Sequence, residues 1–214
     1  MLFKNREHAA RLLAQRLISC RGKNPLVLGI PRGAVPMAKI IAEELGGELD
    51  VVLVHKLGAP GQPELAIGSV DETGRVYLSD YVTALGISED YIQEETEKQL
   101  ATLRRRRVLY TPSRPSIDPS RRIVIVVDNG IATGATMIAA LRSVREKKPH
   151  KLIGAVAVAP PATVARLSNE ADHIVCLKVP AYFEAVGQFF EDFSEVTDDE
   201  VVEILGRGDW KQAV

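Results

Sequence analysis

The stretch Val126–Thr136 reads V-V-D-N-G-I-A-T-G-A-T, and it overlaps an apolar run, Ile123–Val127, that predicts a buried β-strand. An acidic residue, Asp128, stands at the end of that strand, and a short loop rich in Gly and Thr follows it. The apolar periodicity of Met137–Val144 then predicts a helix. This order of strand, loop and helix is typical of a parallel strand in an α/β sheet.

The loop in this stretch is suited to binding a phosphate group. Backbone N–H groups without intrahelical acceptors and the positive end of the helix dipole meet at a helix N-terminus. Gly130 and Gly134 permit unusual backbone angles and close approach of an anion, and Thr133 and Thr136 add hydroxyl donors. The carboxylate of Asp128 stands where it can accept hydrogen bonds from sugar hydroxyls. The predicted ligand is therefore a phosphorylated sugar.

Two other phosphate-binding motifs do not fit the loop. A Walker A loop needs a Lys directly after its second Gly, and no Lys follows Gly134. The spacing of Gly130 and Gly134 does not make the G-x-G-x-x-G dinucleotide fingerprint. The segment instead resembles the 5-phosphoribosyl-1-pyrophosphate (PRPP) motif of the type I phosphoribosyltransferases, which has an apolar strand, two acidic residues and G-x-A-T-G-x-T. An ordinary strand–turn–helix with small residues is the alternative.

The resemblance implies roles for the residues of this motif. It implies that the 5-phosphate is held by Ala132, Thr133, Gly134, Ala135 and Thr136. It also implies that Asp128 and Asn129 are catalytic, because the family's acidic pair receives the ribose 2′- and 3′-hydroxyls. Asn129 departs from the family pattern: it keeps a carbonyl acceptor but lacks the negative charge, and hydrogen bonds to neutral acceptors are weaker. Ribose binding is expected to survive while transition-state stabilisation weakens.

Composition narrows the class of protein. At 214 residues, with 46% apolar and 26% charged residues, the chain fits one globular domain. A net charge of −1 gives no case for nucleic acid or an acidic membrane as partner. Cys20 and Cys176 have neither metal nor redox spacing and are expected to be buried thiols. The charged start and the lack of any run of about 18 apolar residues predict a soluble cytoplasmic protein.

Strands and helices alternate along the chain. Helices are predicted over Arg6–Ser19, Met37–Leu45, Ser88–Tyr110 and Ala162–Ser168, followed by an acidic helical tail. Strands are predicted over Leu26–Ile30, Val51–Val54, Leu152–Val158 and His173–Leu177, with a hairpin of Ala66–Val70 and Arg75–Leu78. The alternation predicts an α/β fold, a mainly parallel sheet flanked by helices, with a small hood or hairpin subregion. We expect a single domain over residues 1–214, with a core at about 22–180 and a C-terminal hood and tail at about 181–214.

Two further loops are expected beside the phosphate loop, because ligands of such sheets bind beyond the carboxyl ends of the strands. The loop Gly29–Pro36 resembles the family's pyrophosphate-binding loop, with Arg32 offering a planar fork of donors and Gly33 permitting close approach; a rigid turn with a solvated Arg is the alternative. After His55 and Lys56, a Gly- and Pro-rich segment is expected to be a loop. The resemblance implies that this loop closes over the site and that Lys56 is catalytic and contacts pyrophosphate.

Two other features have competing interpretations. Tyr182 and Phe183 are candidates for stacking on the base, since a ring face accepts any flat heterocycle, or else they fill the core under the tail. The arginine run Arg104–Arg107 lies at the end of a predicted helix, where consecutive residues point in different directions. It is expected to be a solvated helix end that favours the helix dipole, with a subunit contact as the alternative.

The resemblance, which extends over nearly the whole chain to a bacterial subgroup of unknown substrate, implies a phosphoribosyltransferase of nucleotide metabolism. Such an enzyme binds PRPP with Mg²⁺ carried by the substrate and not by a direct protein metal site, and transfers the 5-phosphoribosyl group to a small-molecule base with release of pyrophosphate. The expected assembly is a homodimer that binds neither nucleic acid nor membrane. Two alternatives use the same loop: a non-catalytic PRPP or nucleotide sensor, and a hydrolase or phosphorylase of a ribose 5-phosphate compound.

Overall fold

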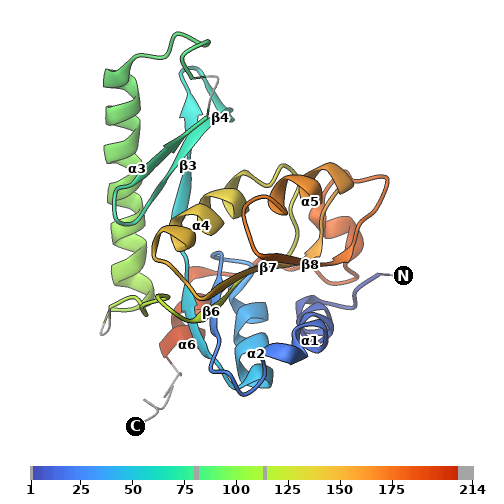
Figure 1. Ribbon diagram of the computed structural model, residues 1–214. Helices are drawn as coiled ribbons and strands as arrows, with labels where there is room; N and C mark the ends of the chain where they lie inside the picture. Colours follow the sequence, from blue (N-terminus) through green and yellow to red (C-terminus); the bar gives the residue numbers. More distant parts are fainter. Residues whose placement is uncertain (1, 80–81, 113–114, 207–214) are drawn as a thin grey trace.

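A five-stranded sheet forms the centre of the protein, whose computed structural model describes residues 2–79, 82–112 and 115–206 (Figure 1). The strand order is β2-β1-β6-β7-β8, and every neighbouring pair is parallel. The strands are β1 (Leu26–Gly29), β2 (Glu48–Val51), β6 (Ile123–Asp128), β7 (Lys151–Val158) and β8 (His173–Lys178). The predicted α/β fold with a mainly parallel sheet is confirmed.

Helices cover both faces of this sheet, as Figure 1 shows. On one face lie α1 (Arg6–Arg16) and α2 (Val35–Leu45), and on the other lie α4 (Ala135–Glu146) and α5 (Pro161–Leu167). Alternate side chains of each strand therefore enter different cores: Val27 packs in the core of α1 and α2, and Leu26 in that of α4 and α5. Because both faces of the central strands are buried, β1, β6 and β7 are mainly continuous apolar runs.

A second, antiparallel sheet and a long helix form an arm that projects from this body (Figure 1). The sheet contains β3 (Val54–Ala59), β4 (Gln62–Asp71) and β5 (Val76–Leu78), and the helix is α3 (Glu89–Tyr110). The Tyr91 hydroxyl of α3 donates to the Gly58 carbonyl oxygen at 2.9 Å, which ties the helix to β3. The predicted hairpin and the predicted long helix are both confirmed.

The sequence prediction was wrong where the chain passes from the central sheet into this arm. The second strand of the central sheet was expected at Val51–Val54 but lies earlier, as β2, and Val54 begins β3 of the second sheet. The Gly- and Pro-rich segment that follows, expected to be a loop, forms the β3–β4 hairpin, with Gly61 in its turn at a φ of +69°. Register shifts beside Gly58 accommodate the irregular sequence, and burial of Leu57 and Ile67 stabilises the pairing.

The C-terminal segment returns to the body of the molecule. A short 3-10 helix, η1 (Ile18–Cys20), follows α1, and a second, η2 (Val186–Phe189), precedes α6 (Asp198–Gly206), which packs beside α2 and α3. Of the tail predicted at about 181–214, residues 207–214 lie outside the described residues. No helix within the described ranges is both long enough and apolar enough to cross a membrane.

Candidate active site

The predicted phosphate loop lies between the end of β6 and the start of α4. Gly134 is the N-cap of α4 with a φ of +84°, a conformation that favours glycine. A Cβ atom added there would lie 3.0 Å from the Cγ2 atom of Thr163, so the space is also tight. The first-turn N–H groups of α4, from Ala135 onward, have no acceptors within the helix. The loop therefore has the backbone geometry of an anion site.

Neighbouring side chains hold the loop in place through its carbonyl groups. The Thr163 hydroxyl donates to the Ala132 carbonyl oxygen at 2.7 Å, and Arg166 donates from Nη1 to the Thr133 carbonyl oxygen at 3.2 Å. Both donors belong to α5. These bonds use carbonyl oxygens of the loop and leave its donors unused, and Thr133 and Thr136 are exposed. The sequence analysis missed Arg166, which lies beside a candidate phosphate site.

Asp128 is the last residue of β6 and one of the two residues predicted to bind the ribose. Its Oδ1 atom accepts a hydrogen bond from the backbone N–H of Asn129 at 2.7 Å. Burial raises the pKa of the Asp128 carboxyl group to about 7, against the opposing effect of hydrogen bonds from the N–H groups of Asn129 and Gly130. In the free protein this carboxyl group is therefore poised to change charge near neutral pH.

Asn129 lies against the loop that follows β1. A Cβ atom added at Gly33 would lie only 2.7 Å from Asn129 Nδ2, so a side chain at position 33 would require this amide to move. The Oδ1 atom of Asn129 is buried and has no hydrogen-bond partner among the residues that the structure describes. Leaving a buried acceptor unsatisfied costs about 1–3 kcal/mol, which a ligand hydroxyl donating to it would recover. Asn129, a predicted ribose-binding residue, therefore lies beside Gly33 of the predicted pyrophosphate-binding loop.

Arg32, in the same loop, contacts a carboxylate of the C-terminal segment. Its Nη2 atom lies 2.5 Å from Glu195 Oε1, with 39% of the Arg32 side chain and 76% of the Glu195 side chain exposed. The peptide bond between Pro31 and Arg32 is cis. Exposed ion pairs contribute about 0–1 kcal/mol, so a pyrophosphate group can displace Glu195 at little cost.

A cavity of about 220 Å³ lies beside this loop and brings four separate segments together. It is lined by Ile30, Pro31, Leu53, Val54, His55, Lys56, Leu103, Arg106 and Thr136. Lys56, Thr136 of the phosphate loop and Pro31 of the β1 loop line this cavity together, and Lys56 lies within β3 and not in a loop. No lining residue among those described is acidic, which suits an anion. The sequence analysis missed Arg106.

The two candidate base-stacking residues lie outside this cavity lining. The side chain of Tyr182 is 89% exposed. Phe183 packs on Phe189 with ring centroids 5.4 Å apart, and it belongs to the core beneath the tail. Tyr182 is therefore the better placed of the two to meet a ligand.

Comparison with known proteins gives matches along most of the chain. The family model of the phosphoribosyl transferase domain matches residues 1–192. Two curated proteins, from two strains of Mycobacterium tuberculosis and both named "Putative phosphoribosyl transferase", are 44% identical over 207 residues. The match covers 96% of this chain but 47% of each relative, so the chain spans about half their length. The crystal structure of TT1426 from Thermus thermophilus is 46% identical, with a TM-score of 0.86, covering 96% of this chain and 98% of that chain.

Proposed function

Because this chain belongs to the phosphoribosyl transferase domain family, we propose that it binds PRPP with Mg²⁺ and transfers the 5-phosphoribosyl group to a ring nitrogen of a small base. The observation that carries this proposal is the contact between Gly33 and Asn129. Gly33 and Asn129 lie side by side, and a sugar phosphate with a 1-pyrophosphate needs neighbouring sites for its ribose and its pyrophosphate, which supports the proposal.

Each part of PRPP has a candidate site. The 5-phosphate binds the loop Ala132–Thr136, at the N-terminus of α4. The ribose hydroxyls bind Asp128 and Asn129, and the pyrophosphate binds the Arg32–Gly33 loop and Lys56. The base approaches from the side of the C-terminal segment, where Tyr182 is exposed.

The proposed reaction needs no covalent nucleophile from the protein. The bond from ribose C1 to the pyrophosphate oxygen breaks and its electron pair leaves with pyrophosphate. A ring nitrogen of the base forms the new bond to C1, and its proton passes to solvent. The protein aligns the reacting atoms and stabilises the changing charges: Asp128 faces the positive charge that develops on the ribose, and Lys56 faces the departing pyrophosphate.

The proposed Mg²⁺ ion reaches the site together with PRPP. Mg²⁺ in phosphate chemistry is commonly held by one or two carboxylates together with substrate phosphates, and Asp128 is the carboxylate at this loop. When bound, Mg²⁺ would neutralise charge on the pyrophosphate.

Calorimetric titration of PRPP into the protein, with and without Mg²⁺, tests the proposal without the unknown base. We expect magnesium-dependent binding, followed by pyrophosphate release when a matching base is added from a panel of purines and pyrimidines. Absence of binding in both conditions would contradict the proposal. PRPP binding without release for any base would favour the sensor alternative, and release without an added base would favour the hydrolase.

The raised pKa of Asp128 predicts a pH dependence of this binding. Its carboxyl group is ionised above its pKa of about 7, and the ionised form is the stronger acceptor for ribose hydroxyls. PRPP affinity should therefore rise by roughly tenfold from pH 6 to pH 8, as the ionised fraction rises from about one tenth to about nine tenths. Asp128→Asn is the control, because the phosphates of PRPP titrate equally with both proteins. The assignment is wrong if the two proteins have the same pH profile.

A further inference from the structure

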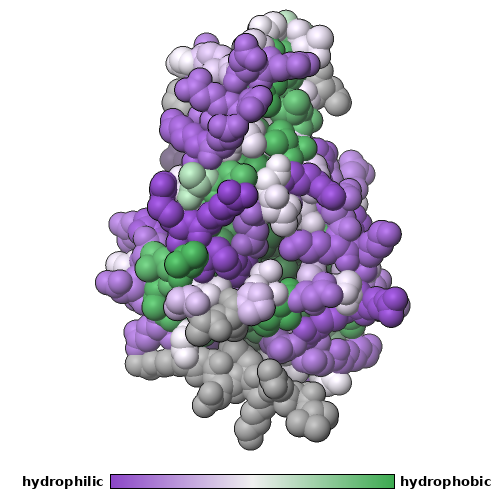
Figure 2. All heavy atoms as spheres, turned by 90° about the vertical axis from the view of Figure 1, so that its left-hand side faces the viewer, coloured by the Kyte–Doolittle hydropathy of each residue, from purple (hydrophilic) through white to green (hydrophobic). Residues whose placement is uncertain are grey.

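The arginine run at the end of α3 is divided between two faces of the helix. Residues three and four apart share a helix face, so Leu103, Arg106, Arg107 and Tyr110 point the same way. Leu103 and Tyr110 are fully buried, which shows that this face packs against the body. Arg104 and Arg105 are exposed, as are the apolar side chains of Val108 and Leu109. Figure 2, which faces α3, shows a largely hydrophilic surface with apolar atoms in separate places.

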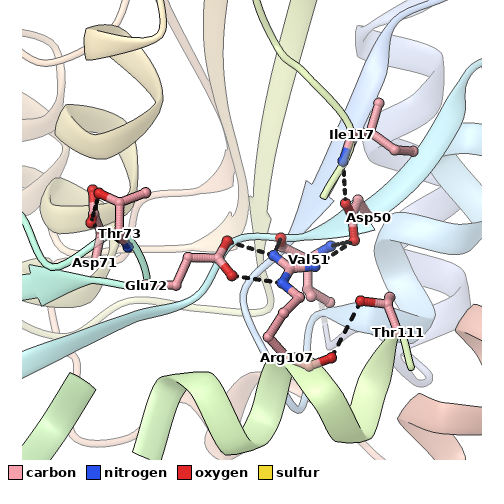
Figure 3. Close-up of polar contacts among 8 residues, drawn as sticks. All are labelled: Asp50, Val51, Asp71, Glu72, Thr73, Arg107, Thr111 and Ile117. Carbon is pink, nitrogen blue, oxygen red and sulfur yellow. Dashed lines mark hydrogen bonds and ion pairs between the residues drawn. The ribbon is translucent and has the colours of Figure 1, made fainter. Parts of the chain in front are cut away.

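Arg107 anchors this face of α3 to β2 and to the turn between β4 and β5, as Figure 3 shows. Its Nε and Nη2 atoms each donate to one oxygen of Glu72 at 2.6 Å. Its Nη1 atom donates to Asp50 Oδ1 at 3.0 Å, and Nη2 also donates to the Val51 carbonyl oxygen at 3.0 Å. Burial acts to lower the pKa of the guanidinium, but Glu72 and Asp50 outweigh it and the pKa is raised. Arg107 is therefore fully engaged in holding the helix.

Arg106 has a different environment, although it is the next residue. It is half-buried, it lines the cavity that also contains Lys56 and Thr136, and it has no hydrogen-bond or ion-pair partner in the part of the chain described. Its charge and that of Arg32 act to lower the pKa of the Tyr110 hydroxyl, which burial and the Asp198 carboxylate raise to about 12. The two guanidinium groups thus lie near the same phenol.

This arrangement leaves a cation without a counter-ion beside the candidate substrate. Lys56 and Arg106 both line this cavity, so two cationic side chains face the same space. A cleft lined by charges of one sign attracts ions of the opposite sign. The guanidinium fork matches the geometry of phosphate oxygens and stays charged at all working pH values. The described lining contains no carboxylate, so the charge of Arg106 is available to an anionic ligand.

We infer that Arg106 is a further pyrophosphate-binding residue, and that Arg107 positions it by holding α3 with Asp50 and Glu72. This inference rests on the proposed function for the identity of the ligand, whereas the negative charge of the ligand is inferred from the cavity lining itself. The inference gives the arm a role in the site, because α3 supplies a cation to the cavity that Pro31 of the β1 loop also lines. The pyrophosphate would then lie among Arg32, Lys56 and Arg106.

Binding of three probes to Arg106→Gln tests the inference. The probes are PRPP with Mg²⁺, inorganic pyrophosphate with Mg²⁺, and ribose 5-phosphate, which lacks the pyrophosphate. We expect Arg106→Gln to weaken binding of the first two by about tenfold or more, the effect of losing a charge-assisted hydrogen bond, and to leave ribose 5-phosphate binding unchanged. Arg105→Gln, an exposed neighbour on the same helix, is the matched control and should bind all three as the wild type does.

The outcomes separate this inference from the proposed function. If the wild type binds PRPP and Arg106→Gln binds it and pyrophosphate equally well, the inference is overturned and the proposed function stands. If the wild type binds pyrophosphate in an Arg106-dependent manner but does not bind PRPP, the inference stands and the proposed function is overturned. If it binds none of the probes, both fail.

The positioning role of the Arg107 cluster has its own test. Glu72→Gln removes one charged partner of Arg107 and should lower pyrophosphate affinity severalfold in the wild-type background. In the Arg106→Gln background the same change should have no further effect, which a general loss of structure would not reproduce. Equal effects of Glu72→Gln in both backgrounds would overturn the positioning role.

Discussion

Asp128→Ala is expected to abolish measurable PRPP binding, with an affinity at least about 100-fold below that of the wild type. The substitution removes the carboxylate at the end of β6, and with it the charged acceptor for ribose hydroxyls and the candidate carboxylate for Mg²⁺. Because burial disfavours the ionised form of Asp128 in the free protein, its removal should not lower stability greatly. Calorimetric titration with PRPP and Mg²⁺, beside a thermal unfolding curve, measures both effects.

Asp118→Ala is the matched control for this experiment. Asp118 lies in an exposed turn before β6, where its carboxylate accepts hydrogen bonds from the Ser120 backbone and hydroxyl. Its loss should leave PRPP affinity unchanged. An Asp128→Ala protein that is folded and binds PRPP as tightly as the wild type would show that the ribose site has been placed wrongly.

Arg107→Met is expected to lower the free energy of unfolding by about 3 kcal/mol or more, because it leaves two carboxylates without their counter-ion in a largely buried place. Asp50 is 1% exposed and Glu72 17% exposed, so water replaces little of what Arg107 provides. Asp50 also accepts a hydrogen bond from the Ile117 backbone N–H at 2.8 Å. Loss of the counter-ion of Asp50 would therefore disturb the chain after α3 as well. Urea denaturation followed by circular dichroism gives the free energy.

Methionine keeps much of the apolar stem of arginine, which confines the change to the charge. Arg105→Met on the exposed face should stay within about 0.5 kcal/mol of the wild type. Asp50→Asn combined with Arg107→Met should cost less than the sum of the two single changes, since each then removes a charge that the other leaves unpaired. Additive costs, or equal stability of the Arg105 and Arg107 variants, would contradict a coupled ion-pair cluster.

The parallel sheet and the phosphate loop could be predicted because their signals are local. The run Ile123–Val127 and the loop residues Gly130 and Gly134 follow each other directly in sequence, and the alternation of strands and helices fixes which sheet edge they occupy. The β3–β4 hairpin could not be predicted in the same way. Its Gly- and Pro-rich turn favours a loop locally, while pairing over the whole of β4 and burial of Leu57 favour strands.

One feature of the arginine run Arg104–Arg107 could be predicted from the sequence, and another could not. The spacing of Leu103, Arg106, Arg107 and Tyr110 places all four on one helix face, and this pattern could have indicated that two of the arginines point inward. Their partners could not be predicted, because Asp50 is 57 residues away from Arg107 and no local pattern joins them. The pairing of Arg32 with Glu195, 163 residues apart, is equally invisible in the sequence.

The close approach of Gly33 and Asn129 has a consequence for how this site can change during evolution. Any side chain at position 33 meets the amide of Asn129, whose Nδ2 atom would be 2.7 Å from the new Cβ. The two positions are therefore coupled: a larger residue at 33 requires the side chain at 129 to become smaller or to turn away. Replacement of Asn129, in contrast, leaves Gly33 acceptable. Position 129 is thus the one from which the chemistry of this site can diverge without a change at position 33.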